Sequence, residues 1–416
     1  YLVDEGPRIY VERIDINGNE KTRDFVIRRE LGFAEGDPFN RSMVTRAKAS
    51  IESLGFFQSV SIDLQPGSAA DKVHLIINVI EASTGDYGAT VGWASDQGLL
   101  GEVSLTERNF LGRGQYLRAA VGASMLGRTF DFSFTEPRFM GLRISSGFDV
   151  YHRIVDENST SFYGSTATGG QVRFGAPITR DLAATVYTGL ETRTFVDVNA
   201  PLSVVGPDGA GTPGSIDGET RNKAWIGYSL VYNTLDDMKV PTSGFYATFS
   251  QQYLGWDYSL LKTEAKARYF MPLFEDWGVV ASVKGQAGII NSFNGGVPAV
   301  EAFQIGNSLV RGFANRGAGP RFATAGLGEN LGATMYAGLS GELDFPLPMV
   351  PETYGLRGAI WADAAWIGGA GSDLDGDAIP VDGASVNQPL KSSVGASVIW
   401  YSPFGPIRGD AGYVIT

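Results

Sequence analysis

The feature that most constrains the fold is a period-two alternation of apolar and polar residues that recurs from residue 86 to the end of the chain. In segment 261–269, Leu261, Ala265 and Tyr269 share one face, and charged residues occupy the other. Such alternation is typical of a β-strand with one apolar face. In a soluble sandwich that face would form the core, whereas in a membrane barrel it would meet lipid. One segment leaves both alternatives open.

The number and spacing of such segments favour the membrane barrel. We count fifteen candidate strands between residues 86 and 416, and many of them run for 9–14 residues. A tilted transmembrane strand needs about 9–11 residues, whereas strands of globular proteins average about 5–6. No run approaches the about 18 apolar residues of a transmembrane helix. Short connections such as 137–140 alternate with long ones such as 292–330, as in outer-membrane barrels, whose short turns are periplasmic.

The strand count also predicts a missing element. Bacterial single-chain barrels have even strand numbers, and fifteen is odd. The last candidate strand ends at Thr416, on the side of the long loops. We therefore expect a sixteenth strand outside this chain. Because the chain begins at Tyr1 without a signal peptide, we also expect a leader or upstream domains to have been removed.

Residues 8–82 have a different pattern, which predicts a small α+β domain. The expected order is a strand at 9–16, helices at 25–31 and 40–54, and strands at 57–64 and 73–79. We expect Thr22 to cap the first helix. Edge strands near 59–64 and 73–80 are candidates for binding extended peptide by strand addition, with a purely structural spacer as the alternative.

Composition excludes several classes of chemistry. The chain has no cysteine, only two histidines, His74 and His152, and a net charge of −12. Thiolate catalysis, Cys-ligated metal and nucleic-acid binding are therefore not expected. The acidic run at 373–377 does not match a calcium-binding EF-hand loop. We expect no enzyme, no cofactor and no metal site.

Short motifs at the connections point to a known family. Three of the short turns contain Glu107–Gly114, Thr135–Phe139 and Pro241–Gly244. The long connection after the eleventh candidate strand contains Gly-Asn-Ser-Leu-Val-Arg-Gly-Phe at 306–313. In order and spacing, these motifs resemble the superfamily that joins periplasmic POTRA domains to a sixteen-stranded barrel, and the BamA family within it. The resemblance covers essentially the whole chain.

The resemblance implies a fold and a function. The fold would be a POTRA domain at 8–82, followed at 86–416 by a transmembrane antiparallel β-barrel that lacks its last strand. The function would be that of an insertase in the Gram-negative outer membrane, which folds and inserts β-barrel proteins through a weak seam between its first and last strands. The alternative is a two-partner secretion or TamA-like translocation barrel. Implied partners are unfolded barrel clients, periplasmic accessory lipoproteins and outer-membrane lipid, without nucleic acid.

Arg311, within the 306–313 motif, is the central candidate residue. A guanidinium inside a barrel lumen needs acidic partners, and alternation along 338–345 and 355–367 turns Glu342 and Asp363 inward. From the residues alone, a solvated arginine and two ordinary luminal acids remain the alternative. The resemblance implies that they pair and hold the loop in the lumen. We name the expected group the loop-lock cluster: Arg311, Gly312, Phe313, Glu342 and Asp363.

The first barrel strand is the second candidate site, because the family uses it as a lateral gate. It has two glycines and a short alternation, so we expect weak pairing along one edge. An ordinary barrel strand is the alternative. The gate residues are Asp86, Tyr87, Gly88, Ala89, Thr90, Val91, Gly92 and Trp93.

Overall fold

The computed structural model describes most of the chain in two sheets. The described residues are 8–94, 98–156, 163–196, 218–238, 240–314, 316–323, 330–379, 381, 389–402 and 405–416. The domain boundaries expected at 8–82 and 86–416 stay a prediction.

The N-terminal sheet is small and carries two helices. Its elements are β1 (Tyr10–Asn17), α1 (Asp24–Leu31), α2 (Arg41–Ser53), β2 (Phe57–Pro66) and β3 (Lys72–Glu81). The strand order is β1-β3-β2, with β1 parallel and β2 antiparallel to β3. Apolar side chains of the helices and strands, including Ile27, Ile51 and Leu75, form one buried core.

Two expectations for this region are wrong. Segment 73–80 belongs to β3, the central strand, because the chain returns through both helices to pair β3 in parallel with β1. The edges are therefore β1 and β2. Thr22 is not the helix cap: Arg23 occupies that position without a side-chain cap bond, and the Thr22 hydroxyl bonds elsewhere.

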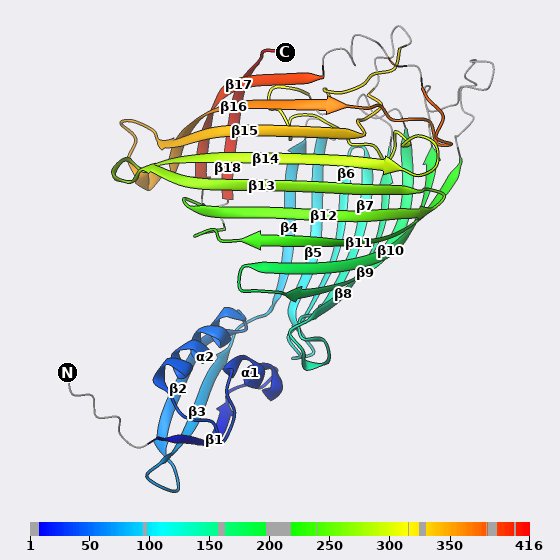
Figure 1. Cartoon of the computed structure of the whole chain (residues 1–416). Coiled ribbons are helices and arrows are strands. Elements are labelled where there is room, and N and C mark those ends of the chain that lie inside the picture. The colour runs from blue at the N-terminus through cyan, green and yellow to red at the C-terminus, as the bar shows by residue number, and fades with distance from the viewer. Residues whose placement is uncertain are drawn as a thin grey trace. The chain divides into compact units, whose positions relative to one another are not determined.

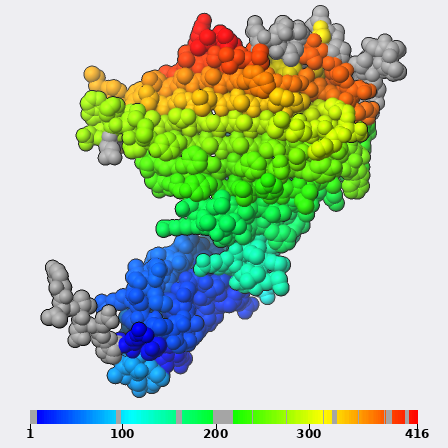
Figure 2. Space-filling view, in the orientation of Figure 1, coloured from blue at the N-terminus to red at the C-terminus, as the bar shows by residue number. Residues whose placement is uncertain are grey.

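The larger sheet has fifteen antiparallel strands, and each pairs with its neighbours in sequence, from β4 at one edge to β18 at the other (Figure 1). Figure 2 shows successive bands of colour from green through yellow to orange on this sheet. The bands follow the chain because each strand lies beside its neighbours in sequence. Among the described strands the sheet is not closed. The strands are β4 (Gly85–Ala94), β5 (Gly98–Phe110), β6 (Gln115–Ser124), β7 (Gly127–Glu136), β8 (Ser145–Val155), β9 (Gly164–Pro177), β10 (Leu182–Val196), β11 (Thr220–Asn233), β12 (Gly244–Trp256), β13 (Leu260–Phe274), β14 (Val279–Ser292), β15 (Met335–Pro346), β16 (Leu356–Gly368), β17 (Leu390–Ser402) and β18 (Gly405–Val414).

The two faces of this sheet follow the alternation of the sequence. In β16, Ile360 and Trp366 are exposed on one face, whereas Asp363 is buried on the other. Leu339 and Leu343 are exposed in the same way on β15. A row of exposed apolar side chains is expected on strands that face lipid. None of the helices in the described part of the chain is long and apolar enough to cross a membrane.

Candidate functional site

The connection between β14 and β15, residues 293–334, folds onto the inner face of the sheet. Short bridges join Phe303 to Ala333 and Ile305 to Ala318 within its described part. Leu309 and Val310 are buried in a core that also contains residues of the strands around them. Burial of these two apolar side chains fixes the backbone immediately before Arg311. The loop is therefore held by packing before its charges are considered.

Arg311 makes a two-pronged contact with Asp363. Its Nε donates to Oδ2 at 2.8 Å and its Nη2 to Oδ1 at 2.7 Å. The backbone amide of Arg311 also donates to Oδ2, at 2.9 Å. Paired bonds between a guanidinium and a carboxylate restrict orientation as well as distance. Asp363 therefore fixes both the side chain and the backbone of Arg311.

Glu342 and the neighbouring strand complete the contacts of Arg311. Its Nη1 donates to Glu342 Oε2 at 2.5 Å, and its Nη2 donates to the Ser340 hydroxyl at 2.9 Å. The guanidinium carbon lies 4.0 Å from the ring centre of Trp361, a cation–π contact. The side chains of Arg311, Glu342 and Asp363 are only 18%, 9% and 2% exposed.

Strand register explains why these acids meet the loop. Ser340 lies opposite Asp363 across β15 and β16, and Glu342 lies opposite Trp361. All of them alternate with exposed apolar residues, so they share the inner face. The structure thus brings Arg311, Glu342 and Asp363 together. Gly312 has a φ of +92°, in the left-handed region that glycine tolerates, and Phe313 packs against the loop core.

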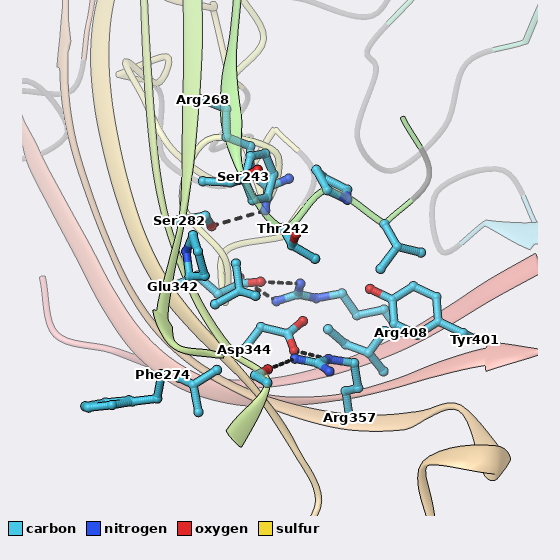
Figure 3. Close-up of a pocket in the computed structure, with 18 residues that line it drawn as sticks. Thr242, Ser243, Arg268, Phe274, Ser282, Glu342, Asp344, Arg357, Tyr401 and Arg408 are labelled. Atoms are coloured by element: carbon cyan, nitrogen blue, oxygen red, sulfur yellow. Dashed lines mark hydrogen bonds and ion pairs between the residues drawn. The ribbon is translucent and has the colours of Figure 1, made fainter. Parts of the chain in front are cut away.

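Sequence reasoning missed a second arginine in this group. Arg408 of β18 donates to both oxygens of Glu342 at 2.8 Å (Figure 3). Glu342 therefore lies between the guanidinium groups of Arg311 and Arg408. Arg408 also pairs with Asp410 at 2.8 Å. The signal was available, because Ile407, Arg408 and the residues after them alternate in the same way. The contact joins β18 to β15.

A second charged group, also missed, holds the beginning of the loop. Glu301 accepts from Lys223 Nζ of β11 at 3.0 Å, and Lys223 also pairs with Glu191 of β10 at 3.3 Å. Arg193 pairs with Glu191 at 2.8 Å, and the Tyr151 hydroxyl donates to Glu191 at 2.6 Å. The exposure of Glu191 and Glu301 is 7% and 12%. The loop is thus attached to two separate parts of the sheet.

The expected gate residues lie in β4, which has a hydrogen-bonded neighbour on one side only among the described strands. Tyr87 and Val91 are 90% and 78% exposed. Asp86 forms an ion pair with Arg108 of β5. The side chain of Trp93 lies outside the described residues. Among the described strands, this edge of β4 has no strand partner, and the outward side chains of Tyr87 and Val91 are apolar.

Glu81, just before β4, is connected through hydrogen bonds of Thr22 to the end of β5. The carboxylate of Glu81 accepts from the amides of Thr22, at 2.6 Å, and Lys21. Burial alone would raise the pKa of Glu81, but these bonds outweigh it and hold the pKa below its usual range. The Thr22 hydroxyl accepts from Asn109 Nδ2 at 2.8 Å.

The next short turn makes a comparable contact. Arg138, which follows β7, donates to both oxygens of Glu30 on α1, at 3.0 and 3.2 Å. Arg138 belongs to the 135–139 motif on which the family resemblance rests. No group of three or more potential metal ligands occurs within the residues that the structure describes.

Comparisons with known proteins agree with this architecture. A family model for the Omp85 superfamily domain matches residues 109–416, and a POTRA model described as a surface antigen variable number repeat matches residues 9–82. The outer membrane protein assembly factor BamA of Neisseria meningitidis serogroup B is 30% identical over 99% of this chain and 55% of its own length. BamA of Neorickettsia risticii is 28% identical over 99% of this chain and 53% of its own length. The chain spans about half the length of these curated relatives.

Solved structures show the same fold. The crystal structure of BamA from Haemophilus ducreyi lacking POTRA domains 1–3 has a TM-score of 0.78 at 23% identity, and the match covers 99% of this chain and 82% of that one. CdiB from Acinetobacter baumannii has a TM-score of 0.56 at 12% identity, covering 98% of this chain and 71% of that one.

The family also locates the chain in the cell. Its BamA relatives are outer-membrane proteins whose POTRA domains lie in the periplasm. The connections that follow β5, β7, β9, β11, β13, β15 and β17 lie at the end of the strands from which β4 begins, and therefore on the periplasmic side. With an antiparallel sheet of fifteen strands after a POTRA region, and a family match over most of its length, the chain belongs to the Omp85 superfamily.

Proposed function

We propose that this chain is the membrane part of an assembly factor that folds and inserts β-barrel proteins into the outer membrane. The observation that carries the proposal is the buried contact of Arg311 with Glu342 and Asp363. A passive pore has no need of a loop arginine held by two buried acids. BamA relatives are named as outer-membrane protein assembly factors, which supports the same role.

The loop-lock cluster would keep the inner face of the sheet in one arrangement. Removing one partner of a buried ion pair leaves the other charge unpaired in a poorly solvated place, which costs about 3–5 kcal/mol. The loop is attached to β15 and β16 at Arg311 and to β10 and β11 near Glu301. It therefore resists movement of these strands relative to one another while a client is handled.

The edge of β4 would receive the client. An unpaired strand edge offers amides and carbonyls to an incoming extended segment, which adds as a new strand. Gly88 and Gly92 provide no side chains that would pack across the edge. Free energy for insertion would come from strand pairing and burial of the client in lipid, without nucleotide.

The POTRA region would receive partners from the periplasm. Its sheet ends in the edge strands β1 and β2, and either can pair with an extended segment. We propose unfolded barrel clients and periplasmic accessory lipoproteins as its partners. The hydrogen bonds of Glu81 and Arg138 would couple movement of the POTRA region to movement of the turns of the larger sheet.

Depletion of the full-length protein in its native Gram-negative cell tests the proposal. Several unrelated outer-membrane barrels should fall together, with unfolded precursors in the periplasm. Complementation with full-length Arg311→Ala should restore them incompletely, whereas Lys266→Ala, a charge removal at an exposed position of β13, should restore them fully. Loss of one secreted protein with all other barrels intact would instead identify a two-partner secretion or TamA-like translocation barrel.

A further inference from the structure

Two adjoining cavities lie on the inner face of the sheet beside the loop-lock cluster. Their volumes are about 680 and 780 Å³, and Arg268, Ser282, Glu342 and Arg408 line both of them. The first is bounded by Thr242 (Figure 3) and Gly278, which belong to the connections between β11 and β12 and between β13 and β14, at the periplasmic end of the strands. A segment that enters from the periplasm therefore has access to this space.

The acidic residues of these cavities are already paired. Glu342 holds Arg311 and Arg408, and Asp363 holds Arg311. Asp344 pairs with Arg357, and Asp410 pairs with Arg408. No acidic side chain that lines the cavities is left for a further cation in the part of the chain that the structure describes.

Among the described cationic side chains that line the two cavities, Arg268 and Lys284 have no ion pair with a carboxylate. Arg268 of β13 lies directly opposite Lys284 of β14 in the strand register. Arg268 donates to the Ser282 hydroxyl at 3.3 Å, and its buried Nε has no hydrogen-bond partner. Lys284 Nζ donates only to the backbone oxygen of Ser308, at 3.3 Å.

This arrangement is unfavourable unless an anion joins it. Like charges directly opposite one another destabilise a strand pair, and a buried unsatisfied donor adds a further cost. An anion between the two side chains would remove both penalties. Arg268 lines both cavities, whereas Lys284 lines only the second. Phe270, Phe274 and Val280 give the first cavity an apolar lining, and Leu309 and Phe313 do so in the second, which suits a peptide side chain better than a bare hydrated ion.

The geometry points to an oxyanion site, formed by Arg268 and Lys284, that holds a carboxylate of an unfolded client segment. The assignment of a client rests on the proposed function. The guanidinium Nε and Nη of Arg268 donate to the two carboxylate oxygens, and the Lys284 ammonium supplies the second positive charge. An acidic residue of a segment arriving from the periplasm is thereby retained before its strand pairs with β4.

Binding of two short peptides to the full chain in detergent micelles tests the site. The peptides are blocked at both ends and differ only in a central Glu or Gln, and isothermal titration calorimetry measures their dissociation constants. We expect the Glu peptide to bind at least about tenfold more tightly, because bonds between charged partners contribute about 1.5–3 kcal/mol. Arg268→Gln should abolish the difference, and Arg268→Lys should retain part of it.

A matched control lies on the same strand. Lys262→Gln makes the same change of charge on the same face of β13, but Lys262 does not line either cavity. This variant should keep the full preference for the Glu peptide. Retarded migration on unheated gels would reveal a misfolded variant. The comparison of Arg268→Lys with Arg268→Gln is decisive between folded proteins, because both variants lack the guanidinium and only the lysine variant keeps a positive charge.

Three outcomes would overturn the inference. Equal affinity for the two peptides, or a preference that persists in Arg268→Gln, would show that the pair holds no carboxylate. Inorganic phosphate that binds while neither peptide does would make the occupant a free anion and refute the client assignment. None of these results bears on the depletion experiment, so failure of this site is distinguishable from failure of the proposed function.

Discussion

The wall formed by β15 and β16 and the edge strand β4 each contain an ion pair between an arginine and an aspartate. The two pairs differ in how deeply they are buried. At the wall, Arg311 pairs with Asp363, and their side chains are 18% and 2% exposed. At the edge, Arg108 pairs with Asp86, and their side chains are 48% and 54% exposed. Buried pairs are costly to break, whereas exposed pairs contribute little. The loop therefore holds one part of the sheet through a buried pair, whereas the exposed pair at the edge contributes little, as the proposed exchange of strands at β4 requires.

Arg311→Ala should have the largest effect. It leaves the buried carboxylate of Asp363 without its positively charged partner, and we expect a loss of about 3–5 kcal/mol in the free energy of unfolding. Urea unfolding in lipid vesicles, followed by tryptophan fluorescence, measures this loss. Lys266→Ala is the control, and equal stability of the two variants would remove the distinction between wall and edge.

Glu301→Gln should have the next largest effect, because it removes a buried charge from the second attachment of the loop. Lys223 then keeps only Glu191 as an acidic partner among the described residues. We expect a loss of about 1–3 kcal/mol. The double variant with Arg311→Ala should lose more than either single variant, and an unchanged unfolding midpoint in Glu301→Gln would refute this attachment.

Gly312→Ala should cost less, because the loop contacts remain. A Cβ atom at a φ of +92° is strained, by about 1–2 kcal/mol. Limited proteolysis should show faster cleavage of the loop, with β15 and β16 still protected. Cleavage at the rate of the unsubstituted protein would mean that the glycine is not required.

Arg108→Ala should change stability least of the four substitutions. Both partners of this pair are about half exposed, so the expected loss is at most about 1 kcal/mol. The same urea unfolding experiment measures it. A loss as large as that of Arg311→Ala would show that the β4 edge is locked as firmly as the wall.

Acidification should break the hydrogen bonds of Glu81, which lies just before β4. A change of pH near neutrality should leave these bonds intact. Because the folded-state pKa of Glu81 is lower than its unfolded value, its contribution is complete above the ordinary pKa of 4.5 and is lost as pH falls through the lowered one. The protection factors of the Lys21 and Thr22 amides, which correct for the pH dependence of intrinsic exchange, should therefore be constant from pH 8 to pH 6 and fall only in acid. Glu81→Gln should abolish this acid-dependent loss of protection.

Alternation alone predicts only part of the site. A strict period of two decides which face each strand residue occupies, so it turns Glu342 and Asp363 inward, whereas their pairing with Arg311 is implied only by the family resemblance. The same rule applies to Arg408, whose pairing needs only the neighbouring register. The contacts of Glu301 could not be predicted, because they depend on how a connection without periodicity folds across the sheet.

The N-terminal region shows the corresponding limit for topology. The order of strands and helices was predicted correctly, but the position of β3 between β1 and β2 was not. Adjacent β2 and β3 pair locally, whereas the parallel pairing of β1 with β3 depends on how two helices pack. Thr22 resembles a helix cap in sequence, but its hydroxyl bonds to Asn109, which lies far along the chain.

Hydrogen exchange of the full-length protein in lipid nanodiscs, with and without an unfolded barrel client, tests the central claim most directly. The account predicts that amides of 86–93 exchange at least about tenfold faster than those of 358–366, as expected for local opening of low cost. It also predicts that the client slows exchange in β4 and leaves β16 unchanged. Equal protection of both strands, or a β4 strand that does not respond to the client, would contradict it.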